Sequence, residues 1–119
     1  MEKPTAAAID AFADAFPDDA RATQKKMFGM PAGFINGNMF GGVFGNGVTM
    51  RLAGDRLAEV KALEGVGDFE PMHGRPWKDY AFADATVHGG SSQLRDWMAE
   101  ALEHTAKMPA KKPKARKKK

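Results

Sequence analysis

The chain has 119 residues, of which 43% are hydrophobic and 28% are charged. These proportions fit one globular domain with a modest core and leave little room for a second. The sequence contains no cysteine, which excludes a disulfide framework and a thiolate zinc site, and we expect a cytoplasmic protein. No stretch approaches about 18 consecutive apolar residues, so neither export nor membrane spanning is expected.

The net charge of +3 conceals two segments of opposite sign. Residues 107–119 contain eight basic residues and no acidic one, whereas residues 1–106 contain ten basic and fifteen acidic residues, a net charge of −5. The body of the protein is therefore acidic and lacks the basic patch typical of a nucleic-acid binder. We predict a domain over residues 1–106 and a disordered basic tail over residues 107–119.

A first helix is predicted over residues 5–16. Its apolar residues recur at helical spacing, and Thr5 can cap its N-terminus. Pro17 ends the helix because proline cannot continue the hydrogen-bond ladder. Asp18 and Asp19 then favour a short second helical turn over residues 18–24.

Residues 27–51 are the stretch around which the rest of the chain is organised. They contain two Asn-Gly pairs, Asn36-Gly37 and Asn46-Gly47. Asn-Gly is the strongest short signal for a two-residue hairpin turn, because both positions of a type I′ turn need positive φ. Closing both turns predicts a three-stranded meander in which Phe34 lies opposite Met39 and Phe44 lies opposite Thr49.

Side chains alternate between the two faces of a strand, so this register sorts the meander into two faces. The predicted core face holds Phe28, Met30, Ala32, Phe34, Met39, Val43, Val48, Met50 and Leu52. The other face is mixed and carries Ile35, Phe40 and Phe44 beside Thr49 and Arg51. A bulge at Gly41-Gly42 would shift the far half by one residue and exchange the faces there.

The remaining residues predict a helix over 56–64, strands over 69–72 and 77–85, and a last helix that Ser91 or Ser92 caps. The last helix has a continuous apolar stripe, formed by Leu94, Trp97, Met98, Ala101, Leu102 and Thr105. We therefore predict an α+β domain of two layers, α-β(3)-α-β(2)-α, with the helices on one face of an antiparallel sheet.

Several short motifs follow one another along the chain: Lys26-Met27-Phe28-Gly29, Asn36-Gly37-Asn38-Met39-Phe40, Phe69-Glu70-Pro71-Met72 with Gly74-Arg75-Pro76, and Leu94-x-x-Trp97-x-x-x-Ala101-Leu102. Their order and spacing resemble the TfoX/Sxy N-terminal-domain family over residues 20–106. The resemblance implies a secretion-chaperone-like fold, in agreement with the element order above. Full-length competence regulators of that family have a second, C-terminal domain where this chain has a lysine-rich tail. The family supplies no catalytic residues.

The glycine-rich run over residues 41–47 invites a phosphate-loop hypothesis. A phosphate loop needs a helix N-terminus behind it, but a strand over residues 48–52 follows this run. Turn chemistry explains the glycines without a ligand.

No candidate metal or catalytic site has the required spacing. His73, His88 and His104 lack any metal-ligand pattern, so we expect solvated histidines. Arg75 and Asp79 lie in a loop with no nucleophile or cofactor motif nearby, and we expect them to pair with each other or with neighbours. We predict no cofactor, no metal and no enzymatic activity.

The face that carries Ile35, Phe40 and Phe44 is the better functional lead. Burying such side chains is worth about 1.5–3 kcal/mol each, so we expect something to cover them. One alternative is cover within the monomer, by the N-terminal segment or by Trp77 and Phe82. The other is an interface with a second copy or another protein, with Thr49 and Arg51 as its polar rim.

The tail offers a second candidate site, made of Lys111, Lys112, Lys114, Arg116, Lys117, Lys118 and Lys119. It could bind nucleic acid weakly and without sequence selectivity, or it could only solvate an acidic domain. No aromatic residue is interleaved with the lysines to stack on bases, which favours solvation or non-specific association. We therefore predict a non-enzymatic regulatory or protein-interaction module. A nucleic-acid-associated accessory protein that acts through the tail is the alternative.

Overall fold

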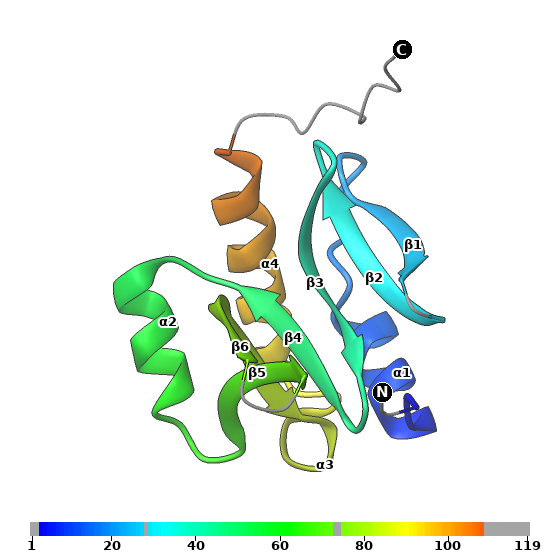
Figure 1. Ribbon diagram of the computed structural model, residues 1–119. Coiled ribbons are helices and arrows are strands. Elements are labelled where there is room, and N and C mark those ends of the chain that lie inside the picture. The colour runs from blue at the N-terminus through cyan, green and yellow to red at the C-terminus, as the bar shows by residue number, and fades with distance from the viewer. Residues whose placement is uncertain (1–2, 28, 73–74, 109–119) are drawn as a thin grey trace.

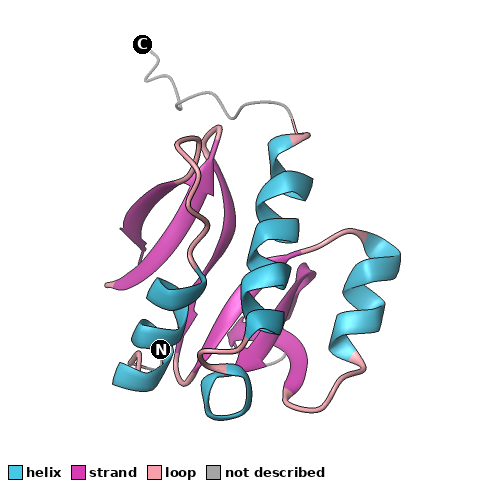
Figure 2. Ribbon diagram, turned by 180° about the vertical axis from the view of Figure 1, so that it is seen from behind, coloured by secondary structure: helices cyan, strands magenta, loops and turns pink. Residues whose placement is uncertain are grey.

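The computed structural model describes residues 3–27, 29–72 and 75–108. The described elements follow in the order α1 (Ala6–Ala15), β1 (Thr23–Met27), β2 (Met30–Ile35), β3 (Asn38–Phe44), β4 (Gly47–Arg51), α2 (Gly54–Lys61), β5 (Val66–Met72), β6 (Arg75–Asp84), α3 (Ala85–His88) and α4 (Ser92–Ala106). The strands form one antiparallel sheet in the order β1-β2-β3-β4-β6-β5. Helix α4 crosses behind the sheet in Figure 1, and Figure 2 shows it from that side. The predicted α+β class is confirmed.

Strand β1 corrects the prediction of a helical turn over residues 18–24. The chain turns at residues 20–21 and then pairs with β2, from Thr23 opposite Phe34 to Met27 opposite Met30. Residues 23–26 are exposed on both faces of this edge strand, so the sequence there shows no apolar alternation. The sheet consequently begins one strand earlier than the meander predicted.

The first hairpin turn is confirmed. Asn36 and Gly37 both have positive φ, 54° and 80°, and Ile35 lies opposite Asn38. The second turn is wrong by one residue, because Phe44 lies opposite Gly47 and the loop is therefore Gly45-Asn46. Gly45 has a φ of 55°, and a glycine at the first loop position is what a type II′ turn requires.

Tertiary hydrogen bonds hold the second turn in this register. The Thr5 hydroxyl donates to Asn46 Oδ1 over 2.7 Å, and the Asn46 side-chain amide donates to Asp84 Oδ1 and Thr86 Oγ1, each over 3.0 Å. Thr5 and Asp84 are the N-caps of α1 and α3. The Asn46 side chain therefore ties the turn to the starts of two helices, a constraint that no local turn rule contains.

A β-bulge at Phe40 changes which residues face the helices. Phe34 lies opposite Met39, as predicted, but Gly33 lies opposite Gly41, so Phe40 is the extra residue. A bulge of this kind exchanges the faces of the strands beyond it. The predicted core face is therefore wrong in part: Val43, Val48 and Met50 face the helices, whereas Met30, Ala32 and Phe34 lie on the opposite face.

The core between sheet and helices is closed mainly by α4, whose predicted apolar stripe is buried along its whole length. Gly41 allows this helix to approach, since a Cβ there would lie 2.8 Å from the Met98 methyl carbon and 2.6 Å from the Thr49 carbonyl oxygen. The side chain of Phe40 is fully buried and packs against Phe16, which follows α1, with ring centroids 5.8 Å apart. The N-terminal segment therefore covers Phe40 within the monomer.

The opposite face of the sheet has a small aromatic cluster of its own. Phe44 lies 5.3 Å from Phe69, and Phe69 lies 6.1 Å from Tyr80, measured between ring centroids. Phe44 belongs to β3 and Phe69 to the edge strand β5, so the sheet curls strongly enough to bring together strands that β4 and β6 separate. Phe44 is thereby covered within one copy of the chain.

Candidate functional site

Ile35, Phe40 and Phe44 do not share one face of the sheet, and all three are covered within one copy of the chain, the first of the two predicted alternatives. The bulge places Ile35 and Phe40 under the helices, and Phe44 packs in the aromatic cluster on the other side of the sheet. Thr49 is buried as well. Substituting Phe40 with aspartate is therefore expected to unfold the domain rather than to separate two subunits.

Arg51 is the predicted rim residue that keeps partial access to solvent, with a side-chain exposure of 23%. Its guanidinium lies 5.6 Å over the Tyr80 ring and forms an ion pair of 3.4 Å with Asp79. Asp79 thus pairs with a neighbour, one of the two outcomes predicted for it. The side chains of Arg75 and Trp77 lie outside the described residues.

A surface hollow lies between Arg56 of helix α2 and helix α4. The two helices lie side by side and run in opposite directions (Figure 1, Figure 2). Leu57 and Val60 of α2 are buried in the core, as is the apolar stripe of α4. Arg56 is the α2 side chain that lines this hollow, and the other lining residues belong to α4.

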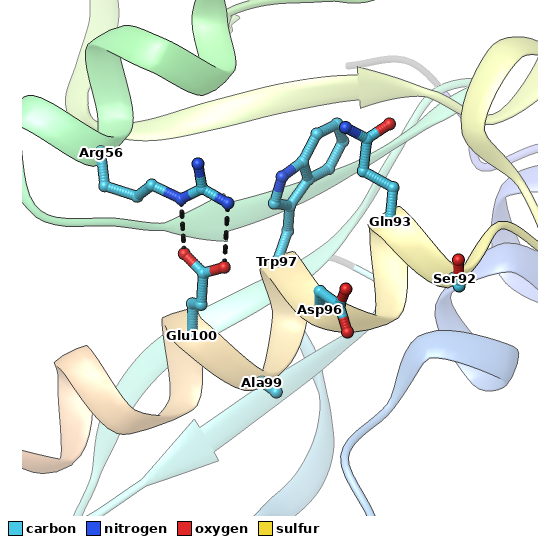
Figure 3. A pocket seen from close by; sticks show the side chains of 7 residues that line it. All are labelled: Arg56, Ser92, Gln93, Asp96, Trp97, Ala99 and Glu100. Atoms are coloured by element: carbon cyan, nitrogen blue, oxygen red, sulfur yellow. Dashed lines mark hydrogen bonds and ion pairs between the residues drawn. The ribbon is translucent and has the colours of Figure 1, made fainter.

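An ion pair between Arg56 of α2 and Glu100 of α4 joins the two helices (Figure 3). The bond from Arg56 Nε to Glu100 Oε1 is 2.6 Å and that from Nη2 to Oε2 is 2.9 Å. A third bond, of 3.2 Å, joins Arg56 Nη1 to Glu59. These hydrogen bonds, first those to Glu100, raise the pKa of Arg56 above its ordinary value. A fork of parallel bonds fixes the relative position of two helices better than a single contact does.

The ion pair separates two hollows, which together we call the α2–α4 groove. The larger has a volume of about 510 Å³ and is lined by Arg56, Ser92, Gln93, Asp96, Trp97, Ala99 and Glu100. The smaller, of about 230 Å³, is lined by Leu52, Ala53, Arg56, Glu100, Glu103, His104 and Lys107. The groove therefore follows α4 along almost its full length.

Trp97 forms the inner wall of the larger hollow. Its side chain is only 1% exposed and packs edge-on against His88, with ring centroids 5.0 Å apart. Figure 3 shows its indole nitrogen on the side of the ring that faces Arg56. The Nε1–H has no hydrogen-bond partner among the described residues, and Nε1 is not one of the buried atoms left without a partner. The donor is therefore open to solvent at the hollow and can serve a molecule that binds there.

His88 is not solvated, which corrects the prediction for this residue. It is 8% exposed, and its Nε2 lies 2.8 Å from the Glu64 carbonyl oxygen. A carbonyl oxygen only accepts, so Nε2 carries the proton of this bond. His104 lines the smaller hollow, and His73 lies outside the described residues. Within the described part of the chain, no three His, Cys, Asp or Glu residues come close enough to hold a metal ion.

The remaining predicted features are placed as follows. The glycine-rich run over residues 41–47 belongs to β3, the turn and the start of β4, so turn and sheet explain it, as predicted. The basic residues from Lys111 to Lys119 lie outside the described residues. In the part of the chain that is described, no helix is long and apolar enough to cross a membrane.

A family model for the TfoX N-terminal domain matches residues 14–105. The chain belongs to the TfoX N-terminal domain family. This confirms the resemblance noted in the sequence, and the match extends from α1 to the last turn of α4. No curated protein and no solved structure matches the chain significantly.

The residues of the groove in this TfoX N-terminal domain were not predicted as a site. Trp97 belongs to the predicted apolar stripe of the last helix, and Arg56 is the first residue of the helix predicted over residues 56–64. Arg56 and Glu100 are 44 residues apart in sequence, so local spacing contains no sign that they meet. An alignment of related sequences that showed these two positions varying together would have revealed the pair.

Proposed function

We propose that this TfoX N-terminal domain is a non-enzymatic protein-interaction module of regulatory type, and that a partner protein binds in the α2–α4 groove. Family membership supports a competence-regulator-like role in general terms. The observation that carries the proposal is the groove itself. It is a surface hollow that runs along α4 and is bordered by Arg56 of α2, whose fork to Glu100 fixes the spacing of the two helices.

The lining of the groove favours a polypeptide over a compact small molecule. Small-molecule sites are mostly apolar and enclose most of their ligand. Here Gln93 and Ser92 offer both donors and acceptors at the surface, as the polar rim of a protein interface does. Arg56 lies inside this rim with 42% of its side chain exposed, and arginine is one of the residue types that most often dominate binding energy.

The test is affinity capture with a tagged full-length chain and nuclease-treated lysate. Asp96→Arg with Ala99→Arg fills the groove and reverses a charge on exposed positions three residues apart in α4. Asp10→Arg with Ala13→Arg makes the same change, at the same spacing, on the exposed side of α1. We expect the wild type and the α1 variant to retain the partner and the groove variant to lose it. Equal recovery by both variants would place the partner elsewhere.

The charge segregation of the sequence supports a second candidate function, non-specific association with nucleic acid through the tail. The full chain is then expected to bind duplex DNA at low salt and to lose binding as salt rises. A chain that ends at Met108 is expected not to bind. Undiminished binding by this shortened chain would exclude the tail as the binding element.

A further inference from the structure

We propose that residues 109–119 bind in the α2–α4 groove of their own chain and compete there with the partner. The competition rests on the function proposed above, but binding of the tail does not. Three observations support it: the charges along the groove, the unused donor of Trp97, and the position and length of the tail.

The lining of the groove holds three acidic side chains, Asp96, Glu100 and Glu103, and two basic ones, Arg56 and Lys107. Arg56 binds Glu100 and Arg21 binds Glu103, whereas Asp96 has no ion-pair partner among the described residues. Residues 109–119 contain seven basic residues and no acidic one, so a basic side chain of the tail can pair with Asp96.

Trp97 supplies an observation that is independent of charge. Its Nε1–H has no partner among the described residues, is not one of the buried unpartnered atoms, and faces the larger hollow (Figure 3). The tail contains Pro109 and Pro113, and proline favours an extended backbone whose carbonyl groups have no internal partner. A main-chain carbonyl of such a segment is an acceptor that the indole can use.

The tail starts at the end of the groove that lies beside the C-terminus of α4. Lys107 is the C-cap of α4 and lines the smaller hollow. Helix α4 has 15 residues and is therefore about 22 Å long. The eleven residues 109–119 can extend over about 36 Å. The tail is thus long enough to turn back at Met108 and reach Asp96 and Ser92 at the far end of the groove.

The experiment follows the indole Nε1–H resonances of the full-length chain by NMR. Trp77→Phe assigns the two signals. The comparison is a full-length chain in which all seven basic residues of 109–119 are replaced by glutamine. We expect the Trp97 signal to differ between the two chains at low salt and the difference to vanish at high salt, where the ion pairs are screened. Asp96→Asn should reduce the difference, whereas Asp10→Asn on α1 should not.

Identical Trp97 signals in the two chains at low salt would overturn binding of the tail. A difference that grows with protein concentration would also overturn it, because it would show binding to a second copy. Capture of the partner separates the two proposals: the glutamine tail is expected to increase recovery. If recovery stays unchanged while the groove variant still loses the partner, the proposed function stands and the competition fails.

Discussion

The hydroxyl of Tyr80 donates a hydrogen bond of 2.9 Å to the main-chain carbonyl of Met39 across strand β4. Met39 directly precedes the bulged residue Phe40, where the ladder between β2 and β3 is interrupted. A side chain from β6 therefore satisfies a carbonyl next to the bulge. This bond links the two halves of the curled sheet, and the bulge it supports places Phe40 under the helices.

Replacing Tyr80 with phenylalanine is expected to lower the free energy of unfolding by about 0.5–1.5 kcal/mol, the usual contribution of one intramolecular hydrogen bond. Urea unfolding at pH 7, followed by circular dichroism, measures this change. Phe82→Tyr is a useful comparison, since it adds a hydroxyl on the same strand at a partly buried position. An unfolding midpoint unchanged by Tyr80→Phe would show that the bond contributes nothing.

The same variant is expected to change the behaviour at alkaline pH. Burial, above all, raises the pKa of Tyr80 above its ordinary value of 10.0. The folded chain therefore holds the phenolic proton more tightly than the unfolded chain does, and stability is lost as the pH rises above 10.0. Tyr80→Phe should remove this part of the alkaline loss. If the unfolding free energies of the wild type and of Tyr80→Phe fell in parallel above that pH, Tyr80 would not be the cause of the alkaline loss.

Gly41→Ala is expected to destabilise the domain by about 1–3 kcal/mol, because the added methyl group collides with the Thr49 carbonyl and with Met98. Gly54→Ala is the matched control. No atom lies within 4 Å of its added Cβ, and it stands in the first turn of α2. Thermal unfolding should show a lower midpoint for the first variant and an equal or higher one for the second. Equal effects would contradict close packing of α4 on β3.

The Arg56–Glu100 pair is expected to show a coupling free energy of about 0.2–1 kcal/mol in a double-mutant cycle with alanine, since both side chains are about 40% exposed. Arg56→Lys keeps the charge but loses the fork of two parallel bonds. Lysine at position 56 should therefore retain little of the coupling free energy with Glu100. Chemical unfolding of the four proteins in the cycle measures this coupling free energy. If Arg56→Lys kept the full coupling, the geometry of the two parallel bonds would be unimportant.

Acid stability should depend on Asp19. Hydrogen bonds from the Arg21 side chain, and next from its backbone, lower the pKa of Asp19 from 3.8 to about 2. The carboxylate therefore stabilises the fold above pH 3.8, and this contribution disappears as the pH falls toward about 2. Asp19→Asn should be less stable than the wild type at pH 5 and equal to it below about pH 2. A difference in unfolding free energy between Asp19→Asn and the wild type that stayed constant at every pH would contradict this role of Asp19.

Much of the helical part of the fold could be predicted from local sequence. Thr5 accepts a hydrogen bond from the Ala8 backbone, and Ser91 does so from Leu94, as their cap positions predicted. The stripe of the last helix was predicted residue by residue. Helix caps and helical periodicity depend on residues within a few positions of one another, so the information is present in any short window.

The sequence by itself determined the α+β class, the caps of α1 and α4, and the turn at Asn36-Gly37, because each depends on residues close together in the chain. Only the tertiary structure decided the bulge at Phe40, the turn at Gly45-Asn46 and the α2–α4 groove. These depend on contacts between residues about 40 positions apart, such as Asn46 with Thr5 and Arg56 with Glu100. The packing of whole elements selects such contacts, and the candidate site lies among them.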